Sequence, residues 1–313
     1  MITVVVPYFN EHASFQLLLP RLSQTMDAIG EDYQVLVVDN GSSAEEEVRL
    51  RRLLEGRRGY QILRLSRNFG YQGALWAGLD HATGDAVVLM DGDGEDPPEL
   101  IREFVDAWKR GYAVAYGVRR SRRGRMLMRL AYAIFYRVLA RYSDVSIPLD
   151  AGEFSLIGGE ALAAVRKFQD RTRMLRILRA WVGYRQIGIP YDREARLAGV
   201  SKFGFRRALA FAWQGFTAST DLPVRFAITA SMGCLGLSAA GIVYYFLWYF
   251  FGQVAIPGFA SLNITILALF GVLFTCLAII ARYLMALLDE TRRRPPYLVD
   301  HSPNPVLTDA GQS

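Results

Sequence analysis

The sequence predicts an α/β fold in which helices flank a mostly parallel sheet, followed by a C-terminal hairpin of two transmembrane helices. Two observations predict this architecture. Within the first 120 residues, apolar runs of strand length alternate with longer stretches of helical periodicity. Within the last third, residues 226–251 and 262–281 contain no charged side chain, and each run is long enough to cross a hydrocarbon core of about 30 Å.

The alternating region is expected to contain five strands and four helices. In a parallel sheet, ligands bind outside the carboxyl ends of the strands, so the polar residues that follow each apolar run are the candidate site. The expected strands are residues 2–6, 34–38, 60–65, 86–90 and 113–116, and the expected helices are residues 14–29, 44–54, 71–82 and 98–110.

The composition of the 313 residues excludes several classes of protein. A hydrophobic share of 52% and a charged share of 21% exclude a disordered or fibrous chain. Two cysteines cannot form a disulfide framework, and three scattered histidines argue against a histidine-rich zinc site. The net charge of +6 comes from one region, because residues 119–141 hold eight arginines and no acidic residue.

The acidic segment at residues 91–99 carries the clearest chemical signal. Asp91 and Asp93 directly follow an apolar run, so both carboxylates can turn toward one hard cation. A divalent metal held by one or two carboxylates usually completes its coordination with substrate phosphates, which suits a nucleotide diphosphate. An EF-hand fits poorly, because the sixth and twelfth positions counted from Asp91 are Asp96 and Arg102. An acidic turn without a ligand is the alternative.

Several short motifs together resemble a known family. Residues 7–11 (PYFNE), 38–42 (VDNGS), 66–70 (SRNFG) and 91–99 (DGDGEDPPE) resemble the family-2 glycosyltransferases of the GT-A fold. Residues 150–154 (DAGEF) and 196–202 (RLAGVSK), followed by the apolar hairpin, make the chain similar to the polyprenyl-phosphate glycosyltransferases, which include dolichol-phosphate mannose synthase and its bacterial relatives. The resemblance covers roughly residues 2–290.

The resemblance implies roles for individual residues. Asp39 would face the base, and Glu153, which stands where the family uses an aspartate, would be catalytic together with Asp93. The residues implied in binding the nucleotide sugar are Pro7, Tyr8, Asn10, Glu11, Asp39, Arg67, Asn68, Gly70 and Asp91. The ligands implied for Mg²⁺ or Mn²⁺ are Asp91, Asp93 and Glu95, where Glu95 replaces a glutamine that is frequent in the family. The candidates for gripping the acceptor phosphate are Arg119, Arg120, Arg129, Arg196, Ser201 and Lys202.

The arginine-rich region continues into an amphipathic helix. Between residues 126 and 141, leucine, isoleucine and valine recur at helical spacing and arginines occupy another side. Such a helix lies in the membrane interface with its arginines toward lipid phosphates. A nucleic-acid partner is the competing interpretation, and it is disfavoured because the chain carries its own apolar hairpin. We therefore expect interfacial helices near residues 119–143 and 203–220, a membrane bilayer as partner and no nucleic acid.

Basic residues at both outer ends of the hairpin, such as Arg225 and Arg282, place both ends in the cytoplasm by the positive-inside rule. The chain opens into an apolar strand and not into a signal peptide. We expect a cytoplasmic GT-A domain at residues 1–220, a hairpin at 221–288 and a cytoplasmic tail at 289–313, anchored in the inner membrane. The alternative is a helical hairpin buried in a soluble core.

The predicted function is inverting transfer of a hexose from a nucleotide sugar to a polyprenyl phosphate, dependent on a divalent metal. A UDP-sugar is preferred as donor, and a GDP-sugar stays open. Small residues between positions 233 and 241 could support a homo-oligomer. Two alternatives remain: a glycosyltransferase that acts on a lipid hydroxyl, and a non-catalytic membrane scaffold that kept the fold. A processive polysaccharide synthase is disfavoured, because residues 169–173 lack the tryptophan of its Gln-x-x-Arg-Trp motif.

Overall fold

The computed structural model describes residues 1–120, 151–168, 174–194, 258–291 and 294–301, with isolated positions between 229 and 251. The chain divides into two compact units. The first comprises residues 1–140, 145–207 and 294–313, and the second comprises residues 141–144 and 208–293. The boundary predicted at residue 220 lies outside the described residues. The boundary predicted at residue 288 falls inside a helix that continues to Thr291.

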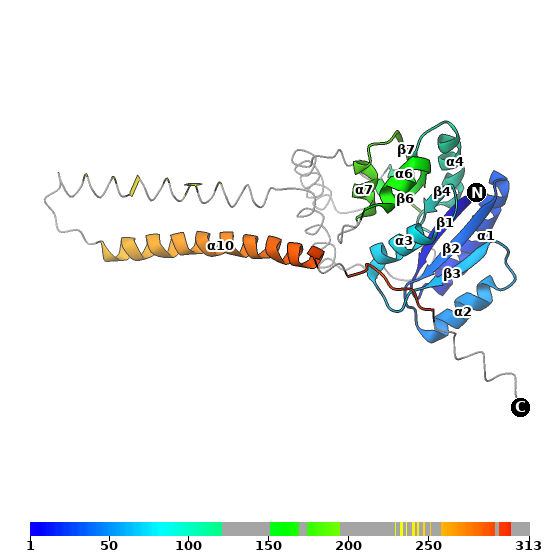
Figure 1. Cartoon of the computed structure of the whole chain (residues 1–313), viewed down its shortest axis with the longest axis horizontal. Helices are drawn as coiled ribbons and strands as arrows, with labels where there is room; N and C mark the ends of the chain where they lie inside the picture. Colours follow the sequence, from blue (N-terminus) through cyan, green and yellow to red (C-terminus); the bar gives the residue numbers. More distant parts are fainter. Residues whose placement is uncertain are drawn as a thin grey trace, which may run out of the picture. The chain divides into compact units, whose positions relative to one another are not determined.

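One seven-stranded sheet forms the centre of the first unit, in the order β3-β2-β1-β4-β6-β5-β7 (Figure 1). Every pairing is parallel except the two made by β6, which runs antiparallel to β4 and to β5. The predicted mostly parallel sheet is therefore confirmed, as are the five predicted strands. The strands are β1 (Ile2–Tyr8), β2 (Tyr33–Asp39), β3 (Tyr60–Arg64), β4 (Ala86–Leu89), β5 (Val114–Arg119), β6 (Ala151–Gly158) and β7 (Gln186–Tyr191).

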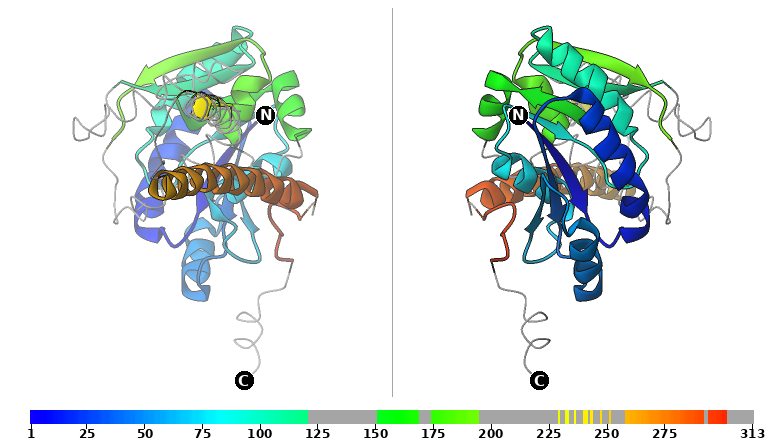
Figure 2. Two further views of the ribbon diagram at one scale, coloured as in Figure 1. Left: turned by 90° about the vertical axis from the view of Figure 1, so that its left-hand side faces the viewer. Right: turned by 90° about the vertical axis from the view of Figure 1, so that its right-hand side faces the viewer.

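Helices cover both faces of the sheet (Figure 2). Successive residues of a strand point to opposite faces, so Val4 and Val6 pack with α1, α2 and α4, whereas Val5 packs with α3, α6 and α7. The four predicted helices are confirmed, the last of them as a short 3-10 turn followed by α4. The helices of this unit are α1 (His12–Ile29), α2 (Ala44–Leu54), α3 (Gly70–His81), η1 (Pro98–Leu100), α4 (Ile101–Lys109), α6 (Gly159–Arg166) and α7 (Leu175–Trp181).

The carboxyl ends of six strands share one edge of the sheet. The antiparallel strand β6 begins at that same edge, and its pairing of Ser155 with Leu89 places Glu153 beyond the end of β4. The strand order reverses between β1 and β4, which is where α/β sheets bind their ligands. We call this edge the rim. It consists of residues 8–11, 39–43, 65–70, 90–97, 119–120, 151–153 and 191–194.

The C-terminal segment at residues 294–301, which we call the strap, returns to the first unit. Val299 pairs with Leu65 in an antiparallel bridge just past the end of β3. The backbone N–H groups of Ser66 and Asp300 donate to the carbonyls of Leu298 and Arg64, at 2.9 and 2.8 Å. The strap therefore occupies hydrogen-bonding positions at one end of an edge strand, which would otherwise be open to pairing with another chain.

Helix α10 (Phe259–Thr291) belongs to the second unit and includes the second predicted span, residues 262–281. Over the described part of the chain, no helix combines the length and the hydropathy that crossing a membrane requires. The first predicted span, residues 226–251, and the predicted interfacial segments lie almost entirely outside the described residues. The membrane hairpin therefore stays a prediction.

Helix α3 lies so close to β1 that only glycine fits at the contact. A Cβ atom at Gly78 would lie 2.1 Å from Cγ1 of Val5. We expect Gly78→Ala to lower the free energy of unfolding by about 1–3 kcal/mol, because overpacking displaces a strand of the core. Chemical denaturation followed by circular dichroism measures this change.

The matched control is Gly271→Ala in α10, where a Cβ atom would meet nothing within 4 Å. An added methyl group in an open helical position does not destabilise a helix. Equal stability of the Gly78→Ala and wild-type proteins would contradict the close packing of α3 on β1.

Candidate functional site

Two loops of the rim are joined to each other where β1 and β2 end. The backbone N–H of Asn10 donates to Oγ of Ser42 at 3.1 Å, and the N–H of Ser43 donates to Oδ1 of Asn10 at 3.0 Å. Asn10 has a φ of 51°, in the left-handed region that asparagine tolerates better than most residues. These bonds fix the floor of the predicted nucleoside site.

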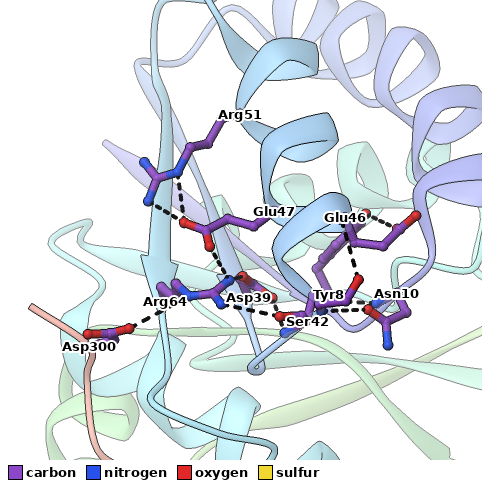
Figure 3. A network of polar contacts seen from close by, with 10 residues as sticks. Tyr8, Asn10, Asp39, Ser42, Glu46, Glu47, Arg51, Arg64 and Asp300 are labelled. Carbon is purple, nitrogen blue, oxygen red and sulfur yellow. Dashed lines mark hydrogen bonds and ion pairs between the residues drawn. The ribbon is translucent and has the colours of Figure 1, made fainter. Parts of the chain in front are cut away.

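Beneath this floor, Arg64 joins carboxylates from three parts of the chain (Figure 3). Asp39 has no solvent exposure; one of its oxygens is bound by the Arg64 guanidinium and the other accepts from the N–H of Ser42 at 2.9 Å. Arg64 also pairs with Glu47 at 2.9 Å, and its Nε lies 3.7 Å from Asp300 of the strap. Asp39, predicted to face the base, therefore has both oxygens engaged inside the protein.

Tyr8 lies under the same floor. Its side chain is 1% exposed, its ring meets Phe15 edge-on with centroids 5.6 Å apart, and its hydroxyl donates to Oε2 of Glu46 at 2.9 Å. Burial and the bond to Glu46 raise the pKa of Tyr8. The structure thus places Tyr8 as a support for Glu46 and not as an open stacking surface. Pro7 lies within β1 opposite Val38, and Glu11 stands at the N-cap of α1.

The loop that contains Arg67, Asn68 and Gly70 is exposed at the rim, as a nucleotide-contacting loop requires. The side chain of Asn40 holds it in place by donating to the carbonyl of Gly70 at 3.0 Å and accepting from the N–H of Phe69 at 2.9 Å. Sequence reasoning did not assign this role to Asn40. Its position in the motif at residues 38–42 was the available signal.

The acidic loop after β4 gathers carboxylates on the rim. Asp93 and Asp96 are 6% and 1% exposed. Asp91 accepts from the hydroxyl of Tyr71, and Asp96 accepts from the hydroxyl of Tyr191 at 2.6 Å. Burial, and then the negative charges of Asp96 and Asp93, hold the pKa of Asp91 well above its ordinary value. The charged form of Asp91 is therefore disfavoured beside these carboxylates, and a bound cation would relieve that repulsion.

The three predicted metal ligands do not converge as a set. Within the described ranges, no three His, Cys, Asp or Glu side chains are grouped so that they could hold a metal ion. Glu95 turns instead to Arg193, whose Nη1 lies 2.6 Å from its Oε2. Glu95 is thus paired with a cation of the protein in this structure, and its role as third ligand stays a prediction. Asp91 and Asp93 remain as two candidate metal ligands, and substrate phosphates would have to complete the coordination of the ion.

Glu153, the third residue of β6, lies at the rim. Its Oε1 accepts from Nε2 of Gln72 at 3.0 Å, and its buried Oε2 has no hydrogen-bond partner among the described residues. The hydroxyl of Tyr71 has a raised pKa because of burial and because both Asp91 and Glu153 lie nearby. Tyr71 and Gln72, consecutive in the first turn of α3, thus hold the two carboxylates, and sequence reasoning missed both.

Buried and exposed arginines surround this group. Arg179 is 2% exposed, lies over the ring of Tyr116 at 4.8 Å and donates to the carbonyl of Gly152, and burial lowers its pKa to about 10. Of the predicted acceptor-phosphate residues, Arg119 donates to the hydroxyl of Tyr191 at 3.4 Å, and Arg120 is 61% exposed, 3.6 Å from Asp192. The others, Arg129, Arg196, Ser201 and Lys202, lie outside the described residues.

The motifs that meet at the rim also define a family. Residues 3–164, slightly more than half of the chain, match the model of the family described as Glycosyl transferase family 2. The chain belongs to glycosyltransferase family 2. The predicted family is therefore confirmed, together with a GT-A fold and the expectation of an enzyme that transfers a sugar. The narrower resemblance to dolichol-phosphate mannose synthase stays a prediction.

Relatives match this family-2 chain along almost its full length. An uncharacterized glycosyltransferase of Synechocystis sp. is 36% identical, covering 95% of this chain and 94% of its own. A prophage bactoprenol glucosyl transferase homolog of Escherichia coli is 28% identical, covering 95% and 98%. Among solved structures, glucosyl-3-phosphoglycerate synthase from Mycobacterium tuberculosis, in complex with Mn²⁺, UDP and phosphoglyceric acid, has a TM-score of 0.47 at 18% identity, covering 68% of this chain and 75% of its own.

The Arg64 cluster joins the buried carboxylates of Asp39 and Glu47 beneath the rim loops. We expect Arg64→Met to lower the free energy of unfolding by about 3 kcal/mol, because it leaves Asp39 buried without its cation, whereas Glu47 keeps its ion pair with Arg51. Urea denaturation measures the loss.

Arg49→Met is the matched control, since Arg49 is half exposed and pairs with Glu45 and Glu46 on the surface of α2. Surface pairs of this kind contribute less than about 1 kcal/mol. Similar losses in the two variants would contradict the role of Arg64 as the cation of the floor.

Proposed function

We propose that this family-2 glycosyltransferase moves a sugar from a nucleotide sugar to a polyprenyl phosphate at a membrane surface. The observation that carries the proposal is the meeting, at one rim, of the Asp91 and Asp93 carboxylates with Glu153, whose buried Oε2 finds no partner in the part of the chain that the structure describes. Relatives named bactoprenol glucosyl transferases, which match at least 95% of the chain, support the lipid phosphate as acceptor and glucose as the sugar.

The donor is proposed to lie across the switch between β1 and β4. Its nucleoside would rest on the joined loops of Asn10 and Ser43, next to the exposed Arg67 and Asn68. Its diphosphate would then point toward Asp91. A UDP-sugar is our preferred donor, and a GDP-sugar is the alternative.

The residues fit a divalent ion that is shared with the donor. Mg²⁺ is commonly held by one or two carboxylates plus substrate phosphates, and Asp91 and Asp93 supply two such carboxylates in a loop where burial and then neighbouring carboxylates raise the pKa of Asp91. When bound, Mg²⁺ or Mn²⁺ would neutralise the charge of the leaving diphosphate. Tyr71 orients Asp91 for this role through its hydroxyl.

The chemistry proposed for the acceptor needs no strong base. A phosphate monoester has a second pKa near 6, so it is largely deprotonated at neutral pH. One of its oxygens attacks the anomeric carbon, a new carbon–oxygen bond forms, and the bond to the diphosphate breaks with its electron pair, which inverts the configuration. Glu153, held by Gln72, would orient the sugar or the acceptor.

A lipid hydroxyl is the second candidate acceptor. Such a nucleophile carries a proton that a base must remove, and the Oε2 of Glu153, which has no partner among the described residues, is the observation that keeps this candidate open. The first candidate is preferred because of the names of the relatives.

The membrane location is also a proposal. The uncharged residues 226–251 and 262–281 would form two spans, with the basic flanks and the catalytic domain in the cytoplasm. A membrane anchor would keep the enzyme at the surface where a polyprenyl phosphate presents its head group.

The transfer itself is tested with the purified full-length protein, UDP-glucose, undecaprenyl phosphate and Mn²⁺, with the lipid product read by mass spectrometry. We expect a product heavier by one hexose, and its loss on chelation of the metal. Asp93→Asn should lower turnover at least 100-fold while leaving the unfolding midpoint unchanged. Full turnover by the folded Asp93→Asn variant would refute the metal-binding role, and transfer to a glycerolipid alone would favour the hydroxyl acceptor.

Glu153→Gln separates orientation from base catalysis. General-base catalysis accelerates a reaction by about 10²–10⁴-fold, so removal of a true base should lower kcat by a factor in that range. We expect a loss of about tenfold with the phosphate acceptor, because glutamine keeps the shape and one oxygen of glutamate. A loss of more than 10²-fold, measured as kcat at saturating donor, would make Glu153 the base.

A further inference from the structure

Arg193, an arginine outside the motifs quoted from the sequence, reaches into the acidic loop of the rim. Arg193 follows β7, and its Nη1 lies 2.6 Å from Oε2 of Glu95. Its Nη2 lies 3.9 Å from Oδ2 of Asp91, too far for a hydrogen bond but close enough for a direct electrostatic attraction. The guanidinium therefore bridges Asp91, one of the two proposed metal ligands, and Glu95.

Contacts on both sides hold the backbone of Arg193 in place. Before it, the hydroxyl of Tyr191 donates to Asp96 at 2.6 Å. After it, the N–H of Glu194 donates to the carbonyl of Glu95 at 3.0 Å. The Glu194 carboxylate is in turn bound by Arg21, which also binds Glu99 on the far side of the acidic loop, at 2.9 Å in each case. The segment after β7 is thus fastened along the acidic loop, and the position of Arg193 is built into the fold.

The side chain itself retains freedom that its backbone lacks. The Arg193 side chain is 33% exposed, whereas the two carboxylates that it bridges are 22% and 17% exposed. A long side chain anchored at its base and open at its tip can exchange one anion for another without moving the strand. A diphosphate offers a guanidinium two adjacent oxygens, which is the geometry that arginine binds best.

We propose that Arg193 is a resident counter-cation of the acidic loop, which competes with the divalent ion for Asp91 and is drawn to the diphosphate when a nucleotide sugar binds. The ion then binds weakly to the free enzyme and tightly in the presence of the donor. Arg193 thereby acts as a positioning residue that couples metal binding to donor binding. This inference rests on the proposed function, since it assumes that Asp91 serves a metal and a diphosphate.

The test measures Mn²⁺ binding to the full-length protein by electron paramagnetic resonance, first without nucleotide and then with UDP. In the wild type, UDP should tighten Mn²⁺ binding. Arg193→Gln should bind Mn²⁺ about tenfold more tightly than the wild type when no nucleotide is present, and should gain less from UDP. A merely structural role would move the affinity in the opposite direction, because a disordered loop holds its carboxylates less well.

Two further variants make the result specific. Arg193→Lys keeps the charge with a shorter, single-point contact, and should lie between the wild type and Arg193→Gln. Lys109→Gln removes one positive charge at the opposite edge of the sheet, where Lys109 pairs with Glu31, and should bind Mn²⁺ as the wild type does. If Arg193→Gln fails to fold, a severalfold gain in Mn²⁺ affinity by Arg193→Lys supports the inference and an unchanged affinity overturns it.

Other outcomes separate this inference from the proposed function. Mn²⁺ affinity that is unchanged or weaker in folded Arg193→Gln, while UDP still tightens binding to the wild type, overturns the counter-cation and leaves the metal site intact. Equal tightening in Lys109→Gln also overturns it, because net charge would then explain the effect. Absence of Mn²⁺ binding in every variant, with or without UDP, refutes the metal role in the proposed function itself.

Discussion

Negative charge gathered where the strands end is the constraint on which this site depends. Asp39, Asp91, Asp93, Asp96 and Glu153 all lie at the rim, and most are buried. Buried carboxylates are tolerated only when cations or hydrogen-bond donors compensate them. The protein supplies Arg64 beneath the joined loops of Asn10 and Ser43, Arg193 along the acidic loop, and the hydroxyls of Tyr71 and Tyr191, which donate to Asp91 and Asp96. The charge of Asp39 is fully compensated, because both of its oxygens are bound inside the protein. The charge of Asp91 is only partly compensated, so the acidic loop can still bind a cation.

The topology explains why this charge collects in one place. Six strands run in the same direction, so their polar exits share an edge. The reversed direction of β6 then brings Glu153 to that edge at the start of a strand and not at its end. Helix α3 begins at the same edge, and its first turn serves both Asp91 and Glu153. Because Gly78 lets this helix lie directly on β1, the core packing and the placement of the two carboxylates depend on the same element.

The sequence alone predicted the elements with local signals and missed those without them. Strands β1–β5 are short apolar runs, and α1–α4 show helical periodicity, so both could be recognised from neighbouring residues. Strand β7 contains Gly188 and Pro190 among its six residues and carries no such signal. The motifs located the rim. They could not show that Arg64 forms an ion pair with Asp39, that Tyr8 is buried, or that Arg193 forms an ion pair with Glu95. Those pairings join positions 25 to 98 residues apart and depend on tertiary packing.

The strap has a consequence for how the chain is connected. The second unit is an insertion within the first, because the sequence leaves the first unit at residue 207 and re-enters it at residue 294. Deleting everything after the last long helix would therefore not yield a trimmed catalytic domain. It would strip the partner of Leu65 from the sheet and remove Asp300 from beside Arg64. A version of the first unit without the insertion is better engineered by an internal deletion that retains residues 294–301 at the end of the chain.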